Sequence, residues 1–66
     1  MKLTINGQPR EVAEVTTLAG LLEALGLDPR TVVVERNREI VRKGELARAP
    51  VADGDQIEIV HFVGGG

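Results

Sequence analysis

A single amphipathic helix, set among short β-branched segments, constrains the fold of this 66-residue chain most strongly. Four leucines follow the i, i+3, i+4, i+7 spacing of one helix face: Leu18, Leu21, Leu22 and Leu25. Thr16 or Thr17 can cap the start of this helix, and Gly26 suits its end because glycine readily adopts the left-handed conformation. One helix cannot cover both faces of a sheet. We therefore predict an α+β domain with the helix packed across one face of a mixed sheet.

The residues before the helix predict a β-hairpin. Residues 1–5 alternate apolar and polar side chains, as a half-buried strand does. Asn6-Gly7 is a strong signal for a two-residue hairpin turn. We expect the returning strand at 10–15, with Val12 facing the core. Pro9 indicates a sheet edge, because proline has no N–H to donate to a ladder.

Three further strands are predicted after the helix. Residues 31–35 are β-branched, and a turn at Asn37 leads to a short return strand at 40–41. Asp53-Gly54 predicts a turn before the last strand, at 56–62. Alternation places Ile57 and Ile59 on one face of this strand, and Glu58, Val60 and Phe62 on the other.

Composition argues against catalysis by the chain itself. It has no cysteine and no serine, and His61 is its single histidine. We therefore expect no disulfide, no thiolate metal site and no serine or cysteine nucleophile. Asp53-Gly54-Asp55 resembles the start of a calcium loop, but the remaining ligand positions do not follow, so we predict a turn and no metal site.

Charge and hydropathy limit the partners. The net charge of −2 gives no indication of nucleic-acid binding, and the mixed-sign stretch at 35–48 is better explained as a solvated face. No apolar run approaches the ~20 residues that a membrane span needs. Met1-Lys2 leads directly into a strand rather than a signal peptide. We therefore expect a cytoplasmic location.

The last residues are Val63 and three glycines. Glycine has no side chain to pack and costs much entropy to order, so we expect a single domain at 1–63 and a flexible tail at 64–66. Val63 to Gly66 can extend about 13 Å at ~3.3 Å per residue. Gly64 and Gly65 can then thread a partner's channel and present the ionised α-carboxylate of Gly66. That carboxylate can attack the α-phosphate of ATP in a partner's site, and a sulfide equivalent would convert the adenylate to a thiocarboxylate.

Phe62 is the only aromatic residue of the chain. By alternation it faces away from the apolar side of the last strand. It either covers a sheet edge or anchors an interface, and we favour the anchor because aromatic residues concentrate in binding hot spots. We therefore predict a partner interface at Val60, Phe62 and Val63.

Motifs along the whole chain carry a family resemblance. They are I-N-G near the N-terminus, L-L-E-A-L-G-L in the helix, V-V-V-E-R-N, D-G-D-Q-I-E-I-V and the final G-G. Together they resemble the ThiS family, the sulfur carriers of the thiamine pathway. The chain departs from the family pattern in its third glycine, Gly64, and in V-R-K at 41–43, where members often have V-P-R. The resemblance implies a β-grasp, ubiquitin-like fold.

The resemblance also implies a function. Gly66 would be adenylated by a ThiF-type activating enzyme that uses ATP and Mg, and sulfur would come from a donor such as a cysteine desulfurase. The resulting thiocarboxylate would supply a ThiG-type thiazole synthase with the sulfur of the thiazole ring. The chain itself would be a protein substrate that binds no cofactor stably.

The sequence leaves three alternatives open. The small subunit of molybdopterin synthase shares the fold, tail and activation, but those chains tend to be longer. A ubiquitin-like modifier would instead be joined to lysines of other proteins. A regulatory β-grasp module without chemistry would not need a terminal glycine pair.

Overall fold

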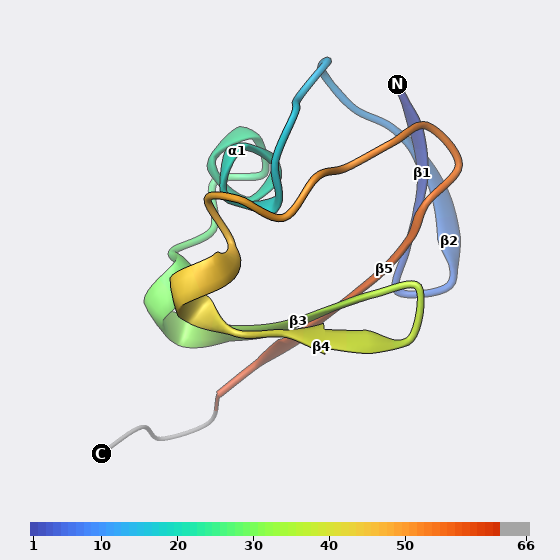
Figure 1. Ribbon diagram of the computed structural model, residues 1–66. Coiled ribbons are helices and arrows are strands. Elements are labelled where there is room, and N and C mark those ends of the chain that lie inside the picture. The colour runs from blue at the N-terminus through green and yellow to red at the C-terminus, as the bar shows by residue number, and fades with distance from the viewer. Residues whose placement is uncertain (63–66) are drawn as a thin grey trace.

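The structure, a computed structural model, describes residues 1–62 (Figure 1). Its elements in chain order are strands β1 (Lys2–Ile5) and β2 (Gln8–Glu11), helix α1 (Leu18–Ala24), the 3₁₀ turn Pro29–Thr31, strands β3 (Val32–Arg36) and β4 (Glu39–Val41), the 3₁₀ turn Lys43–Glu45 and strand β5 (Gln56–His61).

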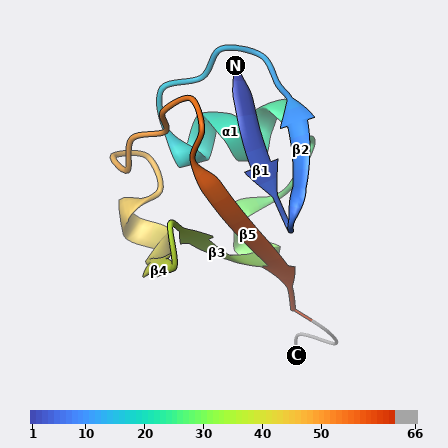
Figure 2. The same ribbon diagram turned by 90° about the vertical axis from the view of Figure 1, so that its right-hand side faces the viewer.

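The strands form one mixed five-stranded sheet in the order β2-β1-β5-β3-β4. β1 and β5 are parallel neighbours at its centre, and the other neighbours are antiparallel. α1 lies across one face of this sheet, behind β1 in the view of Figure 2. The predicted α+β architecture is therefore confirmed.

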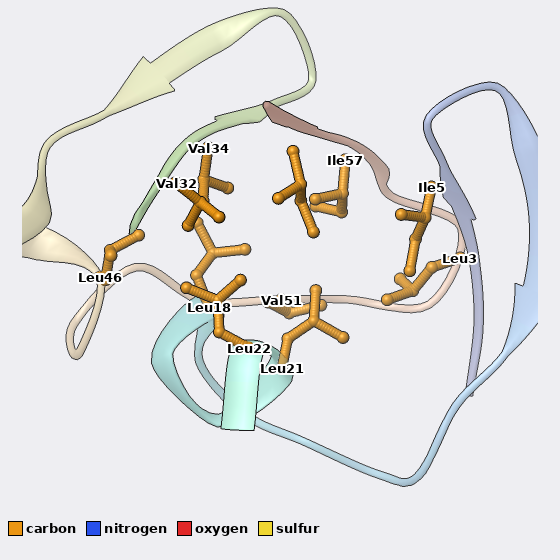
Figure 3. Close-up of a cluster of buried hydrophobic side chains, with 11 residues drawn as sticks. Leu3, Ile5, Leu18, Leu21, Leu22, Val32, Val34, Leu46, Val51 and Ile57 are labelled. Carbon is orange, nitrogen blue, oxygen red and sulfur yellow. The ribbon is translucent and has the colours of Figure 1, made fainter. Parts of the chain in front are cut away.

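The core fills the space between α1 and the inner sheet face (Figure 3). Three leucines of the predicted stripe, Leu18, Leu21 and Leu22, are fully covered. The sheet and the long loop after β4 supply the other buried side chains: Leu3, Ile5, Val32, Val34, Leu46, Val51, Ile57 and Ile59. Ile57 and Ile59 thus share the buried face of the last strand, as their alternation predicted.

The first hairpin forms as predicted, but its second strand lies nearer the turn. Asn6 and Gly7 both have positive φ, 50° and 81°, as a two-residue hairpin turn of type I′ requires. Because the turn is so short, Gln8 pairs directly with Ile5, and the strand covers Gln8–Glu11 rather than 10–15. Pro9 lies in an edge strand, as predicted.

Both predicted helix ends are confirmed. The Thr17 Oγ1 accepts a hydrogen bond from the Gly20 N–H at 3.1 Å, so Thr17 rather than Thr16 is the cap. Gly26, with a φ of 74°, directly follows Leu25, the C-cap residue of α1. Leu25 is only partly buried because it lies at the end of the stripe.

Asp55 joins the loop before β5 to the β3–β4 turn. Its carboxylate accepts hydrogen bonds from Arg36 Nε at 2.8 Å, Asn37 Nδ2 at 3.2 Å and the Ala52 N–H at 2.8 Å. Burial opposes its ionisation, but these bonds outweigh burial and lower the pKa of Asp55. The turn predicted at Asp53-Gly54 is present, with Gly54 at a φ of 88°. The stretch at 35–48 was predicted to be a solvated face, but the Arg36 guanidinium in it forms an ion pair with the Asp55 carboxylate.

Candidate functional site

β5 positions the two described residues of the predicted interface. Its alternation buries Ile57 and Ile59 and turns Val60 outward, where 58% of that residue is exposed. Phe62 follows Val60 by two residues and is 50% exposed. Both side chains therefore lie outside the core, as predicted.

Hydrogen bonds hold the end of β5 on both of its sides. Neighbouring β1 ends at Ile5, but the Asn6 side chain extends the pairing. Its Oδ1 accepts from the Ile59 N–H at 2.7 Å, and its Nδ2 donates to the Ile59 carbonyl at 3.2 Å. On the β3 side, the Phe62 N–H donates to the Thr31 carbonyl at 2.9 Å. The chain is thus tied to the sheet as far as Phe62.

Lys43 contacts the exposed aromatic ring. Its Nζ lies 5.0 Å from the centroid of the Phe62 ring and donates to the Arg30 carbonyl at 3.0 Å. A cation over an aromatic ring at an exposed site contributes about 0.5–1 kcal/mol. The contact orients Phe62 while leaving half of it exposed.

A third apolar side chain, Ile40, lies on the same face and was not singled out from the sequence. It is 68% exposed. Cross-strand partners share a face, and Ile40 pairs with Glu35, which pairs with Glu58. We call this surface the outer sheet face. Its members are Val33, Glu35, Ile40, Glu58, Val60 and Phe62. The alternation of Ile40 with the inward Val41 is the sequence pattern that could have predicted the outward orientation of Ile40.

The remaining predicted site residues, Val63, Gly64, Gly65 and Gly66, lie outside the described residues. The domain boundary after residue 63 and the flexibility of the tail therefore stay predictions. Within residues 1–62, no pocket is found and no group of three or more histidine or acidic side chains is arranged to hold a metal ion. No helix in that part of the chain is long and apolar enough to cross a membrane.

The strand order and the single helix across one face define a small domain of the β-grasp class. A crystal structure of the thiamine biosynthesis protein ThiS from Geobacter metallireducens has this fold, with a TM-score of 0.85 and 36% identity over the whole of both chains.

Sequence comparisons identify the family. The sequence model of the ThiS family matches residues 3–66. The sulfur carrier protein ThiS of Bacillus subtilis is 43% identical over 65 residues, which are 97% of this chain and 98% of that protein. A thiazole synthase of Paramagnetospirillum magneticum is 53% identical over all 66 residues, and the chain spans 20% of its length. The chain belongs to the ThiS family, and the resemblance seen in its motifs is confirmed.

Proposed function

We propose that this ThiS-family sulfur carrier of thiamine biosynthesis carries its sulfur on the α-carboxyl group of Gly66. One observation carries the proposal. The family match extends through residue 66 and so includes Gly65 and Gly66, the pair that corresponds to the terminal G-G of the motif pattern. The proposal requires the α-carboxyl of Gly66 to be free.

The chemistry takes two steps in the sites of partner enzymes. A carboxylate oxygen of Gly66 attacks the α-phosphorus of ATP, and pyrophosphate leaves. A sulfide equivalent then attacks the acyl carbon of the adenylate, and AMP leaves as the thiocarboxylate forms. Glycine suits this position because it has no side chain to shield the reacting carbonyl.

The folded domain and the tail would have different roles. Val60 and Phe62 offer apolar surface at the end of β5, where hydrogen bonds with the Asn6 side chain and with the Thr31 carbonyl fix the backbone. A partner that docks there, with Val63 as a further contact, would receive the tail from a fixed starting point. Gly64 and Gly65 would thread the partner's channel, and catalysis would come from the partner. The tail would then act as a flexible extension of the domain at 1–63.

The proposed partners are a ThiF-type adenylating enzyme, a sulfur donor such as a cysteine desulfurase, and a ThiG-type thiazole synthase. The similarity of the whole chain to part of a thiazole synthase supports the last of these. ATP and Mg would be bound by the adenylating enzyme, and the carrier would hold no cofactor stably. These partners imply a cytoplasmic location.

An exchange assay tests the first step. A ThiF-type enzyme with Mg-ATP and labelled pyrophosphate should form labelled ATP only when the carrier is present. Deleting Gly65 and Gly66 should abolish the exchange, because only Gly64 of the glycine run then remains. Glu23→Gln on the exposed side of α1 should leave it unchanged and serves as the control. Full exchange with the deletion variant would contradict Gly66 as the adenylated residue.

A further inference from the structure

The turn between β1 and β2 consists of an asparagine followed by a glycine. Asn6 and Gly7 have φ values of 50° and 81°, and they connect Ile5 directly to its partner Gln8. An asparagine before glycine is especially prone to spontaneous deamidation, because glycine has no Cβ to hinder attack by its backbone nitrogen. The pair that suits this turn is therefore also a chemically reactive pair.

The side-chain amide of Asn6 is occupied on β5. Its Oδ1 accepts from the Ile59 N–H at 2.7 Å, and its Nδ2 donates to the Ile59 carbonyl at 3.2 Å. Deamidation requires the amide carbon of Asn6 to reach the Gly7 nitrogen. That movement breaks both hydrogen bonds to Ile59, so the folded protein can react only when this contact opens locally.

A second asparagine holds β5 from its other neighbour and provides an internal comparison. Asn37, in the β3–β4 turn, has a φ of 49°. Its Oδ1 accepts from the Gln56 N–H at 2.9 Å, and its Nδ2 donates to the Asp55 carboxylate at 3.2 Å. The next residue is Arg38, whose side chain hinders its backbone nitrogen. Asn37 thus has a similar backbone conformation and similar hydrogen bonds, but a less reactive neighbour.

We propose that Asn6 is a spontaneous deamidation site and that its pairing with Ile59 sets the rate of deamidation. The Gly7 nitrogen, after losing its proton, attacks the Asn6 Cγ, and the bond from Cγ to Nδ2 breaks as ammonia leaves with an added proton. Water then opens the resulting cyclic imide at either carbonyl, which gives aspartate or isoaspartate. The reaction needs no enzyme, and the inference goes beyond the proposed function and does not depend on it.

The product should hold the end of β5 less firmly. An ionised carboxylate only accepts hydrogen bonds, so it cannot replace the donor to the Ile59 carbonyl. Isoaspartate would also add one carbon atom to the main chain of a two-residue turn. Because Ile59 lies near the end of β5, deamidation of Asn6 should loosen the strand close to Phe62.

Peptide mass spectrometry after incubation at mildly alkaline pH, with and without urea, tests the rate. In urea, Asn6 should deamidate while Asn37 stays largely intact. In the folded protein, Asn6 should deamidate at least about tenfold more slowly, since two hydrogen bonds must first break. Equal rates for Asn6 in the two conditions would overturn control by Ile59. An intact Asn6 in urea, or equal rates for the two asparagines there, would overturn Asn6 as the reactive site.

Two variants separate the chemistry from its effect on the fold. Gly7→Ala should slow deamidation of Asn6 in urea, where the folded turn no longer strains the alanine, and an unchanged rate would contradict attack by the nitrogen of residue 7. Asn6→Asp, which mimics one product, should lower the thermal unfolding midpoint. Gln8→Glu makes the same amide-to-carboxylate change at an exposed residue of β2 and should leave the midpoint nearly unchanged. Equal midpoints for Asn6→Asp and Gln8→Glu would overturn the predicted loosening of β5.

Discussion

Arg36 donates from its Nε to the Asp55 carboxylate at 2.8 Å and so links the end of β3 to the loop that leads into β5. Hydrogen bonds lower the pKa of Asp55, so the native state favours its ionised form. The resulting stability is present above the unfolded-state pKa of about 3.9 and is lost as pH falls through the lower native value.

Asp55→Asn should therefore lower the free energy of unfolding by about 1–2 kcal/mol at pH 7. The variant should also lose less stability than the native protein between pH 5 and pH 2. Urea unfolding at several pH values measures both effects. Parallel pH profiles for the two proteins would show that Asp55 contributes no charge-dependent stability.

Gly20→Ala should stabilise the domain. A Cβ at this position would lie 3.5 Å from Thr17 Oγ1 and 3.7 Å from Val15 Cβ, which are ordinary contact distances. Alanine is favoured over glycine within a helix by about 1 kcal/mol. We expect the thermal midpoint to rise by about 4–8 °C, the usual response of a small domain.

Gly26→Ala is the matched control for this substitution. Gly26 has a φ of 74°, which strains any residue with a Cβ, so the same chemical change there should destabilise the domain. A lower midpoint for Gly20→Ala would show that the helix start cannot accept the methyl group.

The two faces of β5 should respond differently to charge. Ile57→Asp should unfold the domain, because an aspartate would be buried without a partner in a small core. Phe62→Asp should leave the fold intact, because half of that residue is exposed, and should weaken partner binding at least tenfold, roughly as loss of an interface anchor does. Circular dichroism and binding to the adenylating enzyme test both. Unfolding of the Phe62 variant alone would mean that Phe62 belongs to the core.

Removing Gly65 and Gly66 should leave stability nearly unchanged. Neither residue has a side chain that can bury apolar surface, and the identified core belongs to residues 1–62. The deletion should nevertheless abolish ATP-dependent activation. A fall of several degrees in the thermal midpoint would indicate that the tail packs on the domain.

Local patterns predicted the elements, and tertiary contacts account for what was missed. The leucine stripe, Asn6-Gly7 and the alternation at 56–62 act within a few residues, so the helix, first hairpin and faces of β5 were readable. β2 begins earlier than predicted because the two-residue turn pairs Gln8 directly with Ile5. Contacts such as Asn6 with Ile59 join residues 53 positions apart, which no local pattern reports.

The residues of the outer sheet face could likewise be predicted only in part from the sequence. Val60 and Phe62 were found from the alternation of a single strand. Placing Ile40, Glu35 and Glu58 beside them required the register of three strands, which only the folded sheet supplies. The roles predicted for the three terminal glycines rest on the glycine pattern and the family match. Those glycines, Gly64, Gly65 and Gly66, lie outside the described residues.

Intact-mass spectrometry tests whether Gly66 carries sulfur. The carrier is incubated with a ThiF-type enzyme, Mg-ATP and a sulfur source. A species heavier by the difference between one sulfur and one oxygen atom should form, with the change on the C-terminal peptide. Addition of thiazole synthase and its substrates should restore the original mass. An unchanged mass after incubation, with the fold intact and the enzyme active on its own carrier, would contradict sulfur transfer to Gly66.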